Sequence, residues 1–87
     1  MQELMRNNSY FKTLVNKFIE NTKFLVQLKG TKSYLMHLKR GCNYISKINN
    51  ELYKNGLETI PKPENLSVSN ISSMEENIRN AYAYFLK

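Results

Sequence analysis

The sequence predicts a small all-α protein, an antiparallel bundle of three main helices with a short fourth turn at the N-terminus as an option. Apolar residues recur every three or four positions in three segments, the period of a helix with one buried face. No segment shows the alternation that is typical of strands. With 87 residues, we expect one domain over 1–87, with helices at about 9–29, 33–55 and 69–86 and a loop at 57–66.

The first helix is predicted to begin at a cap, Asn8 or Ser9, and to end at Gly30 in a left-handed conformation. Residues 1–8 are expected to form a frayed arm or a single turn. The apolar stripe of the helix comprises Phe11, Leu14, Val15, Phe18, Ile19, Leu25, Val26 and Leu28. Thr22 interrupts this stripe, and its hydroxyl is expected to bond a carbonyl oxygen of the preceding turn.

The second helix, 33–55, is the longest uninterrupted helical pattern, and the other segments are expected to cover its apolar face. That face is predicted to hold Leu35, Leu38, Cys42, Ile45, Asn49 and Leu52. Gly41 costs about 1 kcal/mol relative to Ala within a helix, so we expect either a close approach of a neighbouring helix or a local bend. Asn49 either sets the packing register or lies at the wet edge of the core. Asn55-Gly56 is predicted to end the helix.

The segment 57–66 contains two prolines, which favour an extended connection over a helix. Its apolar residues Leu57, Ile60 and Leu66 are predicted to pin it across the end of the bundle. The third helix has several competing caps: Ser69, Asn70, Ser72 with Glu75, and Ser73 with Glu76. Its predicted core face consists of Ile71, Met74, Ile78, Ala81, Tyr82 and Phe85. Its predicted outer face consists of Glu75, Glu76, Asn77 and Arg79.

The residue types needed for catalysis are not grouped in this sequence. It has no aspartate, one histidine and one cysteine. His37 and Cys42 are spaced so that they point to different sides of a helix, which makes a Cys–His pair geometrically poor. Cys42 is therefore expected to be a reduced core residue, and a catalytic thiol is the alternative. We expect no enzyme, no metal and no cofactor. With no signal peptide and no membrane-spanning run, a cytosolic location is expected.

The formal net charge of +6 is unevenly distributed. Residues 1–54 hold ten Lys or Arg and three Glu, which makes +7, whereas residues 55–87 hold three and four, which makes −1. The predicted basic surface of the second helix consists of Lys39, Arg40, Lys47 and Lys54. Such a surface favours nucleic acid, an anionic membrane surface or an acidic protein face, and the alternative is that it only keeps the protein in solution.

The C-terminal segment AYAYFLK carries more large apolar side chains than one helix face can bury. Successive side chains lie about 100° apart on a helix, so Tyr82, Tyr84, Phe85 and Leu86 cannot all point into one core. The segment is predicted to meet a protein partner. The alternative is that its aromatic residues clamp the C-terminus onto the bundle.

The order of these features resembles a known family. A helix ending FLVQLKG precedes TKSYLMHLKRGCNYISKINNELYKNG, then a loop and an amphipathic helix that closes on aromatic residues. This resembles the immunity proteins of pediocin-like (class IIa) bacteriocins, of the enterocin A immunity type, over about residues 8–87. The best points of likeness are the Gly30 stop before Thr31-Lys32-Ser33, Ile45-Ser46, Asn55-Gly56 and the Tyr82–Phe85 ending.

The family fold is similar to a four-helix bundle, so here the first family helix is expected to be missing or reduced to one turn. That leaves one apolar face less covered, which favours self-association as a homodimer. The resemblance implies a non-catalytic protein of the cytosol of Gram-positive bacteria, associated with the inner membrane face as an option. The role that the resemblance implies is protection of the producer cell from a membrane-permeabilising peptide.

By resemblance, the partner is the bacteriocin-bound sugar phosphotransferase receptor in the membrane. The C-terminal part of such proteins governs which bacteriocin is blocked, so the implied contact residues here are Tyr82, Tyr84, Phe85 and Lys87. The basic surface of the second helix adds attraction to the anionic inner leaflet. The alternative function is that of a small basic phage or plasmid protein that binds nucleic acid or inhibits a host protein.

Overall fold

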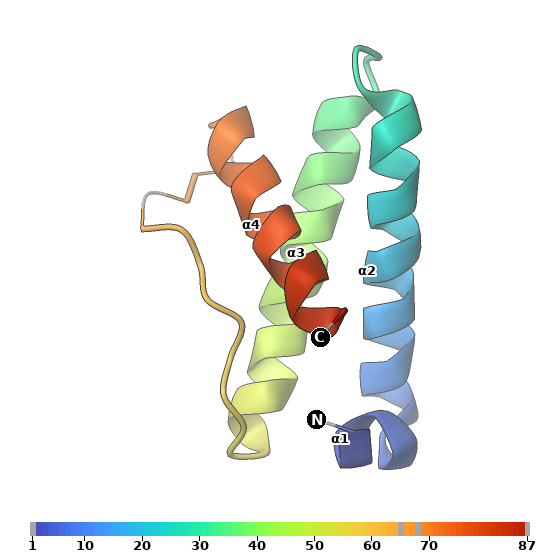
Figure 1. Ribbon diagram of the computed structural model, residues 1–87, viewed down its shortest axis with the longest axis vertical. Helices are drawn as coiled ribbons and strands as arrows, with labels where there is room; N and C mark the ends of the chain where they lie inside the picture. Colours follow the sequence, from blue (N-terminus) through green and yellow to red (C-terminus); the bar gives the residue numbers. More distant parts are fainter. Residues whose placement is uncertain (1, 65, 68, 87) are drawn as a thin grey trace.

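The computed structural model describes residues 2–64, 66–67 and 69–86, and these ranges contain four helices (Figure 1). The helices are α1 (Gln2–Asn7), α2 (Ser9–Leu28), α3 (Tyr34–Lys54) and α4 (Ile71–Phe85). The predicted all-α bundle of three main helices is confirmed, and the optional N-terminal turn is α1. The ends of the three main helices lie within two residues of the predicted ones.

The direction of each helix follows from the connection before it. A short turn around Gly30 reverses the chain, so α2 and α3 run antiparallel (Figure 1). Gly30 has a φ of +88° and Gly56 a φ of +69°, the left-handed backbone predicted for Gly30 and found again where α3 ends. The segment after Gly56 then returns along the side of α3 (Figure 1). As a result, α4 runs beside α3 in the same general direction and opposite to α2.

The connection 57–70 does not cross the end of the bundle, which corrects the predicted path (Figure 1). Ile60 is only 1% exposed and belongs to the core, while Leu57 and Leu66 are partly buried against it. The prediction that these three residues pin the segment is confirmed. α4 begins near the N-terminal end of α3, so the connection, which leaves from the C-terminal end of α3, has to run back along that helix (Figure 1).

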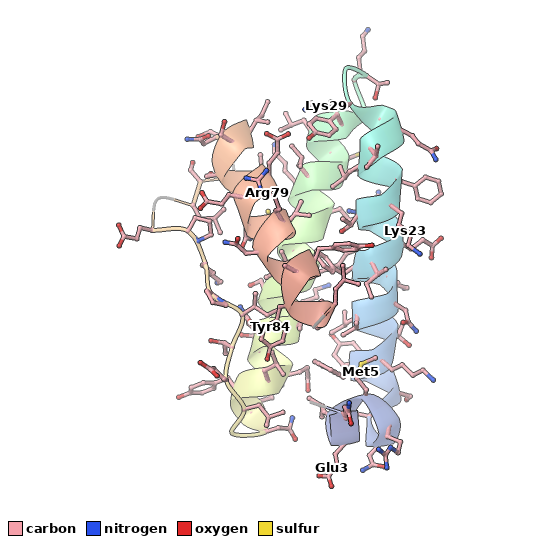
Figure 2. All side chains as sticks on the ribbon, viewed as in Figure 1. Glu3, Met5, Lys23, Lys29, Arg79 and Tyr84 are labelled. Atoms are coloured by element: carbon pink, nitrogen blue, oxygen red, sulfur yellow. The ribbon has the colours of Figure 1, made fainter. Side chains whose placement is uncertain are left out.

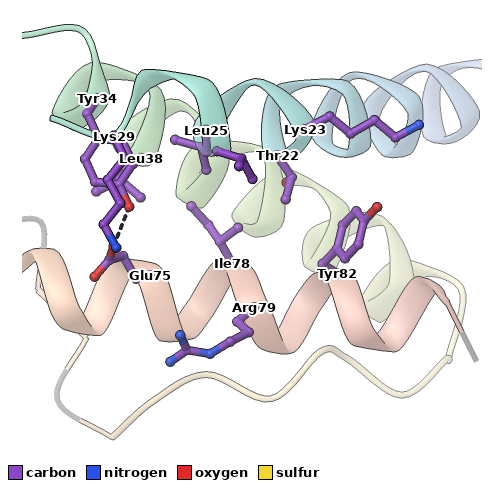
Figure 3. A pocket seen from close by; sticks show the side chains of 11 residues that line it. Thr22, Lys23, Leu25, Lys29, Tyr34, Leu38, Glu75, Ile78, Arg79 and Tyr82 are labelled. Carbon is purple, nitrogen blue, oxygen red and sulfur yellow. Dashed lines mark hydrogen bonds between the residues drawn. The ribbon is translucent and has the colours of Figure 1, made fainter. Parts of the chain in front are cut away.

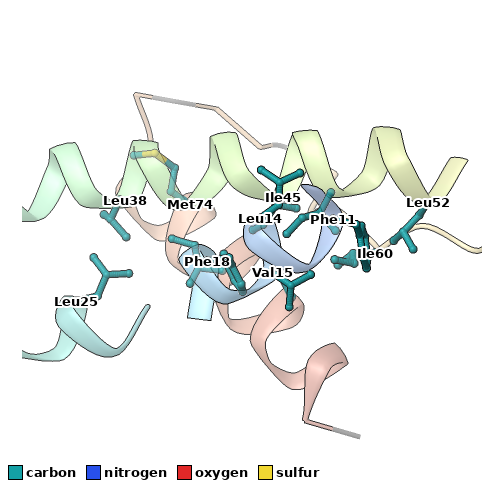
Figure 4. Close-up of a cluster of buried hydrophobic side chains, with 13 residues drawn as sticks. Phe11, Leu14, Val15, Phe18, Leu25, Leu38, Ile45, Leu52, Ile60 and Met74 are labelled. Atoms are coloured by element: carbon teal, nitrogen blue, oxygen red, sulfur yellow. The ribbon is translucent and has the colours of Figure 1, made fainter. Parts of the chain in front are cut away.

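The core lies between α2, α3 and α4 (Figure 4). α3 packs extensively against both α2 and α4, whereas α2 and α4 contact each other much less. The buried hydrophobic residues are Phe11, Leu14, Val15, Phe18, Leu25, Leu38, Ile45, Ile48, Leu52, Ile60, Met74, Ile78 and Ala81. The central position predicted for the second helix is therefore confirmed.

Four positions differ from the faces predicted for them, and Ile48 was left out of the predicted core face. Val26, Leu35 and Ile71 were expected in the core but are 82%, 40% and 45% exposed. Conversely, Ile48 is fully buried and Asn77, expected to face outward, is 1% exposed. Two partners pack on α3 from different directions, which widens its buried face to include Ile48. The three exposed residues lie towards the helix ends nearest Gly30, where α4 diverges from α2 (Figure 1).

Gly41 lies where three helices meet. A Cβ atom at this position would be 2.9 Å from Cδ1 of Ile78 in α4 and 3.2 Å from Nδ2 of Asn21 in α2. The close approach of neighbouring helices, one of the two explanations expected for this glycine, is confirmed. Glycine leaves space here for α4 and α2, which pack on α3 from two sides, and a larger residue would force Ile78 to shift.

The starts of α2 and α4 are capped by asparagine side chains. Asn8 Oδ1 accepts from the Phe11 amide at 3.0 Å, and Asn70 Oδ1 accepts from the Ser73 amide at 3.2 Å. Of the competing caps of α4, Asn70 is therefore the one that is used. Thr22 Oγ1 donates to a carbonyl oxygen one turn earlier at 2.9 Å, as expected.

Candidate functional site

A groove with a volume of about 610 Å³ opens between the C-terminal half of α2 and α4 (Figure 3). The α2 side is lined by Thr22, Lys23, Leu25, Val26 and Lys29. The α4 side is lined by Glu75, Ile78, Arg79 and Tyr82, and α3 contributes Tyr34 and Leu38. On each wall these residues recur three or four positions apart, so each wall is one face of a helix over about two turns.

The groove exists because α2 and α4 both pack against α3 but do not pack closely against each other. They diverge towards the end of the bundle that holds Gly30 (Figure 1). The floor between them is apolar: Leu25, Leu38 and Ile78 are all buried. Val26 lies at the rim with 82% of its surface exposed, so apolar surface continues out of the groove. The arrangement is a recessed apolar strip with an open top.

Three cationic side chains line the groove: Lys23 on α2, Lys29 directly after α2, and Arg79 on α4. All three are exposed. Within the part of the chain that the structure describes, the ion pair formed is that of Lys54 with Glu51, at 3.7 Å. The three cations are therefore not neutralised by an ion pair among the described residues. Both long walls of the groove present positive charge to an incoming partner.

Glu75, the carboxylate in the groove lining, is engaged by Tyr34. The Tyr34 hydroxyl donates a hydrogen bond to Glu75 Oε2, which joins the first turn of α3 to α4 (Figure 3). Burial, then the hydrogen bond to Glu75 and the charge of Glu75, raise the pKa of Tyr34 to about 12. Tyr34 is thus a neutral donor at physiological pH, and Glu75 already has a partner. The groove keeps an excess of positive charge.

The aromatic side chains at the end of α4 face mostly inward. The ring of Phe85 packs against that of Phe18 in α2, with centroids 5.9 Å apart, and against Tyr84 in an edge-to-face contact at 5.6 Å. The hydroxyl of Tyr84 donates to the carbonyl oxygen of Glu58 at 3.4 Å. Phe85 and Tyr84 therefore tie the end of α4 to α2 and to the connection 57–70.

Tyr82 is the predicted contact residue that lines the groove. It is partly buried, and its ring extends from α4 towards α2 (Figure 3). Leu86 follows the helix with 65% of its surface exposed. Lys87, the fourth predicted contact residue, lies outside the described residues. Of the predicted set, the structure therefore brings Tyr82 to the groove and uses Tyr84 and Phe85 in packing.

The predicted basic surface lies on the exposed side of α3. Lys39, Arg40, Lys47 and Lys54 are all exposed, and none of them lines the groove. Arg40, with His37 and Tyr44, lines a smaller hollow of about 270 Å³ between α2 and α3. The structure therefore does not bring the basic surface and the aromatic C-terminus into one site.

Apart from Tyr82, sequence reasoning did not assign the residues of the groove to a site. Arg79 was assigned to an outer face, and Val26 to the core. Hydrophobic periodicity reports which residues share a helix face, and it does not report how far two helices stand apart. No pattern in the sequence marks this groove, because it arises from the divergence of α2 and α4.

Over the described ranges, no three His, Cys, Asp or Glu side chains come together in a way that would hold a metal ion. Nor is any helix there both long enough and apolar enough to cross a membrane. Cys42 is a half-buried free thiol, and burial raises its pKa, while the neighbouring Asn77 amide opposes that shift. Comparison with protein-family models, with curated proteins and with solved structures finds no match for this chain.

Proposed function

We propose that this protein acts without catalysis, by binding another protein, and that its biological role is bacteriocin immunity. The observation that carries the proposal is the groove between α2 and α4. It has a buried apolar floor of Leu25, Leu38 and Ile78. Its rim carries three cations that form no ion pair among the residues that the structure describes. An open apolar groove of this kind is typical of sites that receive a peptide or a helix.

The immunity role is supported by the resemblance of the sequence to the pediocin-like immunity proteins. A helical bundle with a shortened first helix is what that resemblance implies for this chain, and α1 has six residues. The resemblance also assigns partner choice to the C-terminal part, and α4 forms one whole wall of the groove. Tyr82 is then a direct contact, while Tyr84 and Phe85 hold α4 in place.

The proposed partner is the bacteriocin-bound sugar phosphotransferase receptor, met at the inner face of the membrane. The exposed side chains Lys39, Arg40, Lys47 and Lys54 on α3 support an additional, weaker attraction to the anionic inner leaflet. Because these cations lie outside the groove, membrane attraction and partner binding use separate surfaces. The two contributions can then be separated by mutation.

The proposal is tested by expressing the chain in a bacteriocin-sensitive strain and exposing the cells to a panel of pediocin-like peptides. We expect protection against at least one peptide, and loss of that protection when Val26→Asp places a charge in the groove. Val26 is 82% exposed, so this variant should keep its helix content, which circular dichroism checks. Lys47→Ala on α3 is the matched surface control.

Unchanged killing across the whole panel, with the protein present at a measured level, would contradict the immunity role. Retention on DNA or RNA that weakens steeply with salt would favour nucleic-acid binding instead. One dominant protein recovered with the chain from cells that lack any bacteriocin receptor would favour an inhibitor of a host protein.

A further inference from the structure

The groove occupies the place that a fourth helix would take in a four-helix bundle. α2 and α4 each pack on α3 and contact each other little, so their facing sides diverge towards the Gly30 end and leave the groove between them (Figure 1). α1 does not fill this gap. It has six residues, and it lies beside the start of α2, at the opposite end of the molecule from Lys29 and Arg79 (Figure 2).

We propose that this groove receives one amphipathic helix of a partner protein, with apolar residues facing the floor and acidic residues along both flanks. The inference rests on the proposed function in that a protein partner is required. It goes further by naming the structure and charge of the segment that the partner presents. It does not depend on the identity of the partner.

The shape of the groove fits a helix. The lining residues run from Thr22 to Lys29 on one wall and from Glu75 to Tyr82 on the other. With a rise of 1.5 Å per residue, each wall is about 10 Å long, roughly two turns. An amphipathic helix presents anchor side chains at i, i+3, i+4 and i+7 over the same length, and these would fill the recessed apolar strip.

The charge of the groove selects an acidic helix. Lys23 and Lys29 stand on one wall and Arg79 on the other, so cations flank the apolar floor on both sides. Glu75 keeps its negative charge when its carboxylate accepts the Tyr34 hydrogen bond, so it offsets one of the three positive charges and the groove lining keeps a net charge of +2. A helix with Glu or Asp on both edges of its apolar face would meet these cations as it docks. Such complementarity favours both the association rate and the choice of partner.

Two other occupants fit the groove less well. A second copy of this chain docked groove to groove would bring the cations of two rims together, and like charges facing each other across an interface are costly. A membrane surface is a poor match because Leu25, Leu38 and Ile78 are recessed and buried between two helices. A bilayer surface would contact the rim and leave this floor empty.

The experiment uses the full chain and a designed peptide of about 14 residues, roughly four helical turns. The peptide carries Leu at the anchor positions, Glu on both flanks and Ala on its outer face, and a control peptide carries Lys in place of every Glu. Binding is measured by titration calorimetry and mapped by amide chemical shifts. We expect the Glu peptide to bind, with shifts concentrated at residues 22–29 and 75–82. The Lys peptide should not bind.

Variants of the protein locate the contact. Arg79→Glu and Lys29→Glu should each weaken binding of the Glu peptide about tenfold. Lys47→Glu makes the same change in net charge outside the groove, and it should alter the dissociation constant by no more than about twofold. Val26→Asp tests the apolar part and should also weaken binding. All four positions are exposed, so the fold should be kept, and circular dichroism verifies this.

Several results would overturn the proposal. One is no binding of the Glu peptide up to about 1 mM, a weak affinity by any standard. Another is equal weakening by Lys47→Glu and Arg79→Glu, which would indicate general attraction between opposite charges. Binding of phosphatidylglycerol vesicles that perturbs the same groove residues would indicate a lipid surface. Self-association that Arg79→Glu changes would indicate a second copy of the chain.

The inference and the proposed function can fail separately. Peptide binding in the groove without any protection of cells would leave the acidic helix in place and remove the immunity role. Protection of cells that persists in Val26→Asp and Arg79→Glu, without peptide binding, would keep the immunity role and remove the acidic helix as the occupant of the groove.

Discussion

The side chain of Asn49 forms two hydrogen bonds with the backbone of Ile60. Asn49 Nδ2 donates to the Ile60 carbonyl oxygen at 3.2 Å, and the Ile60 amide donates to Asn49 Oδ1 at 2.7 Å. Both residues are buried, and an extended segment has no neighbouring strand to satisfy its amide and carbonyl groups. The Asn49 side chain supplies the hydrogen bonds that a neighbouring strand would otherwise supply. It holds the connection between α3 and α4 in place, a role different from either of the two expected for it.

Replacing Asn49 should therefore destabilise the protein more than an ordinary polar substitution does. Asn49→Ala leaves the buried Ile60 amide and carbonyl groups unpaired, and we expect a loss of about 2–3 kcal/mol in the free energy of unfolding. Urea denaturation measures this loss. Asn50→Ala, at an exposed position on the same helix, is the matched control and should change stability by less than about 0.5 kcal/mol. Equal losses in the two variants would argue against the paired hydrogen bonds.

Gly41 and Ile78 should be energetically coupled. An alanine Cβ at position 41 would lie 2.9 Å from Ile78 Cδ1, so Gly41→Ala forces that side chain to move. The gain of about 1 kcal/mol in helix propensity opposes a packing cost of about 1–3 kcal/mol. We expect a net destabilisation of about 1 kcal/mol from these two terms.

A double-mutant cycle measures this coupling. Ile78→Val removes Cδ1 and should cost about 1 kcal/mol by itself. The double variant should be more stable than the sum of the two single effects predicts, because the atom that clashes with the new methyl group is gone. Strict additivity would show that the two residues do not compete for the same space.

The Tyr34–Glu75 hydrogen bond predicts a loss of stability at high pH. Burial, and then the hydrogen bond and charge of Glu75, raise the pKa of Tyr34 to about 12 in the folded state from its ordinary value of 10.0. The bond therefore contributes fully below pH 10, and its contribution is lost as the pH rises from 10 to about 12, where the unfolded chain alone has released the proton. Since Tyr34 is only partly buried, we expect about 1 kcal/mol after allowing for solvent screening.

Tyr34→Phe should remove this part of the pH dependence. Its stability, measured by urea denaturation, should be about 1 kcal/mol lower than that of the parent chain near neutral pH. The difference between the two proteins should shrink as the pH approaches 12, the folded-state pKa of Tyr34. Tyr53→Phe, at a position that is 79% exposed, is the matched control. A pH-independent difference for Tyr34→Phe would contradict the assignment.

The thiol of Cys42 should react slowly in the folded protein. It is half-buried, its Sγ lies 3.9 Å from the Met74 carbonyl oxygen, and burial raises its pKa. The reactive thiolate is therefore scarce near neutral pH, and we expect a reaction with an aromatic disulfide reagent at least about tenfold slower than in urea. Ser46→Cys, in a Cys42→Ala background, provides an exposed thiol on α3 for comparison. Equal rates at the two positions would contradict the burial of Cys42.

The helices could be predicted because their signals are local. The apolar spacing of Phe11, Leu14, Val15 and Phe18 marks the buried face of α2 without reference to any other segment. Gly30 and Gly56 mark the two turns, since both adopt a left-handed backbone that other residues rarely take. These features depend on a few neighbouring residues, which the sequence displays directly.

The positions whose burial was predicted wrongly all depend on contacts with other helices. Asn77 reads as an outward polar residue, yet it is buried against α3, and Val26 reads as a core residue that α4 leaves uncovered. The sequence of a helix indicates where the centre of its buried face lies, but the neighbouring helices set how wide that face is. That width is set by where the neighbouring helices cross.

The helical class, the positions of the helices and the antiparallel turn at Gly30 can be read from the residues alone, because each follows from short-range periodicity and backbone preference. The hydrogen bonds of Asn49 with Ile60, the hydrogen bond of Tyr34 with Glu75 and the groove between α2 and α4 depend on how the helices pack. Each of these joins residues far apart in the chain through the packing of α2 and α4 on α3. The candidate site is a product of helix crossing geometry, and that geometry has no signature in the local pattern of residues.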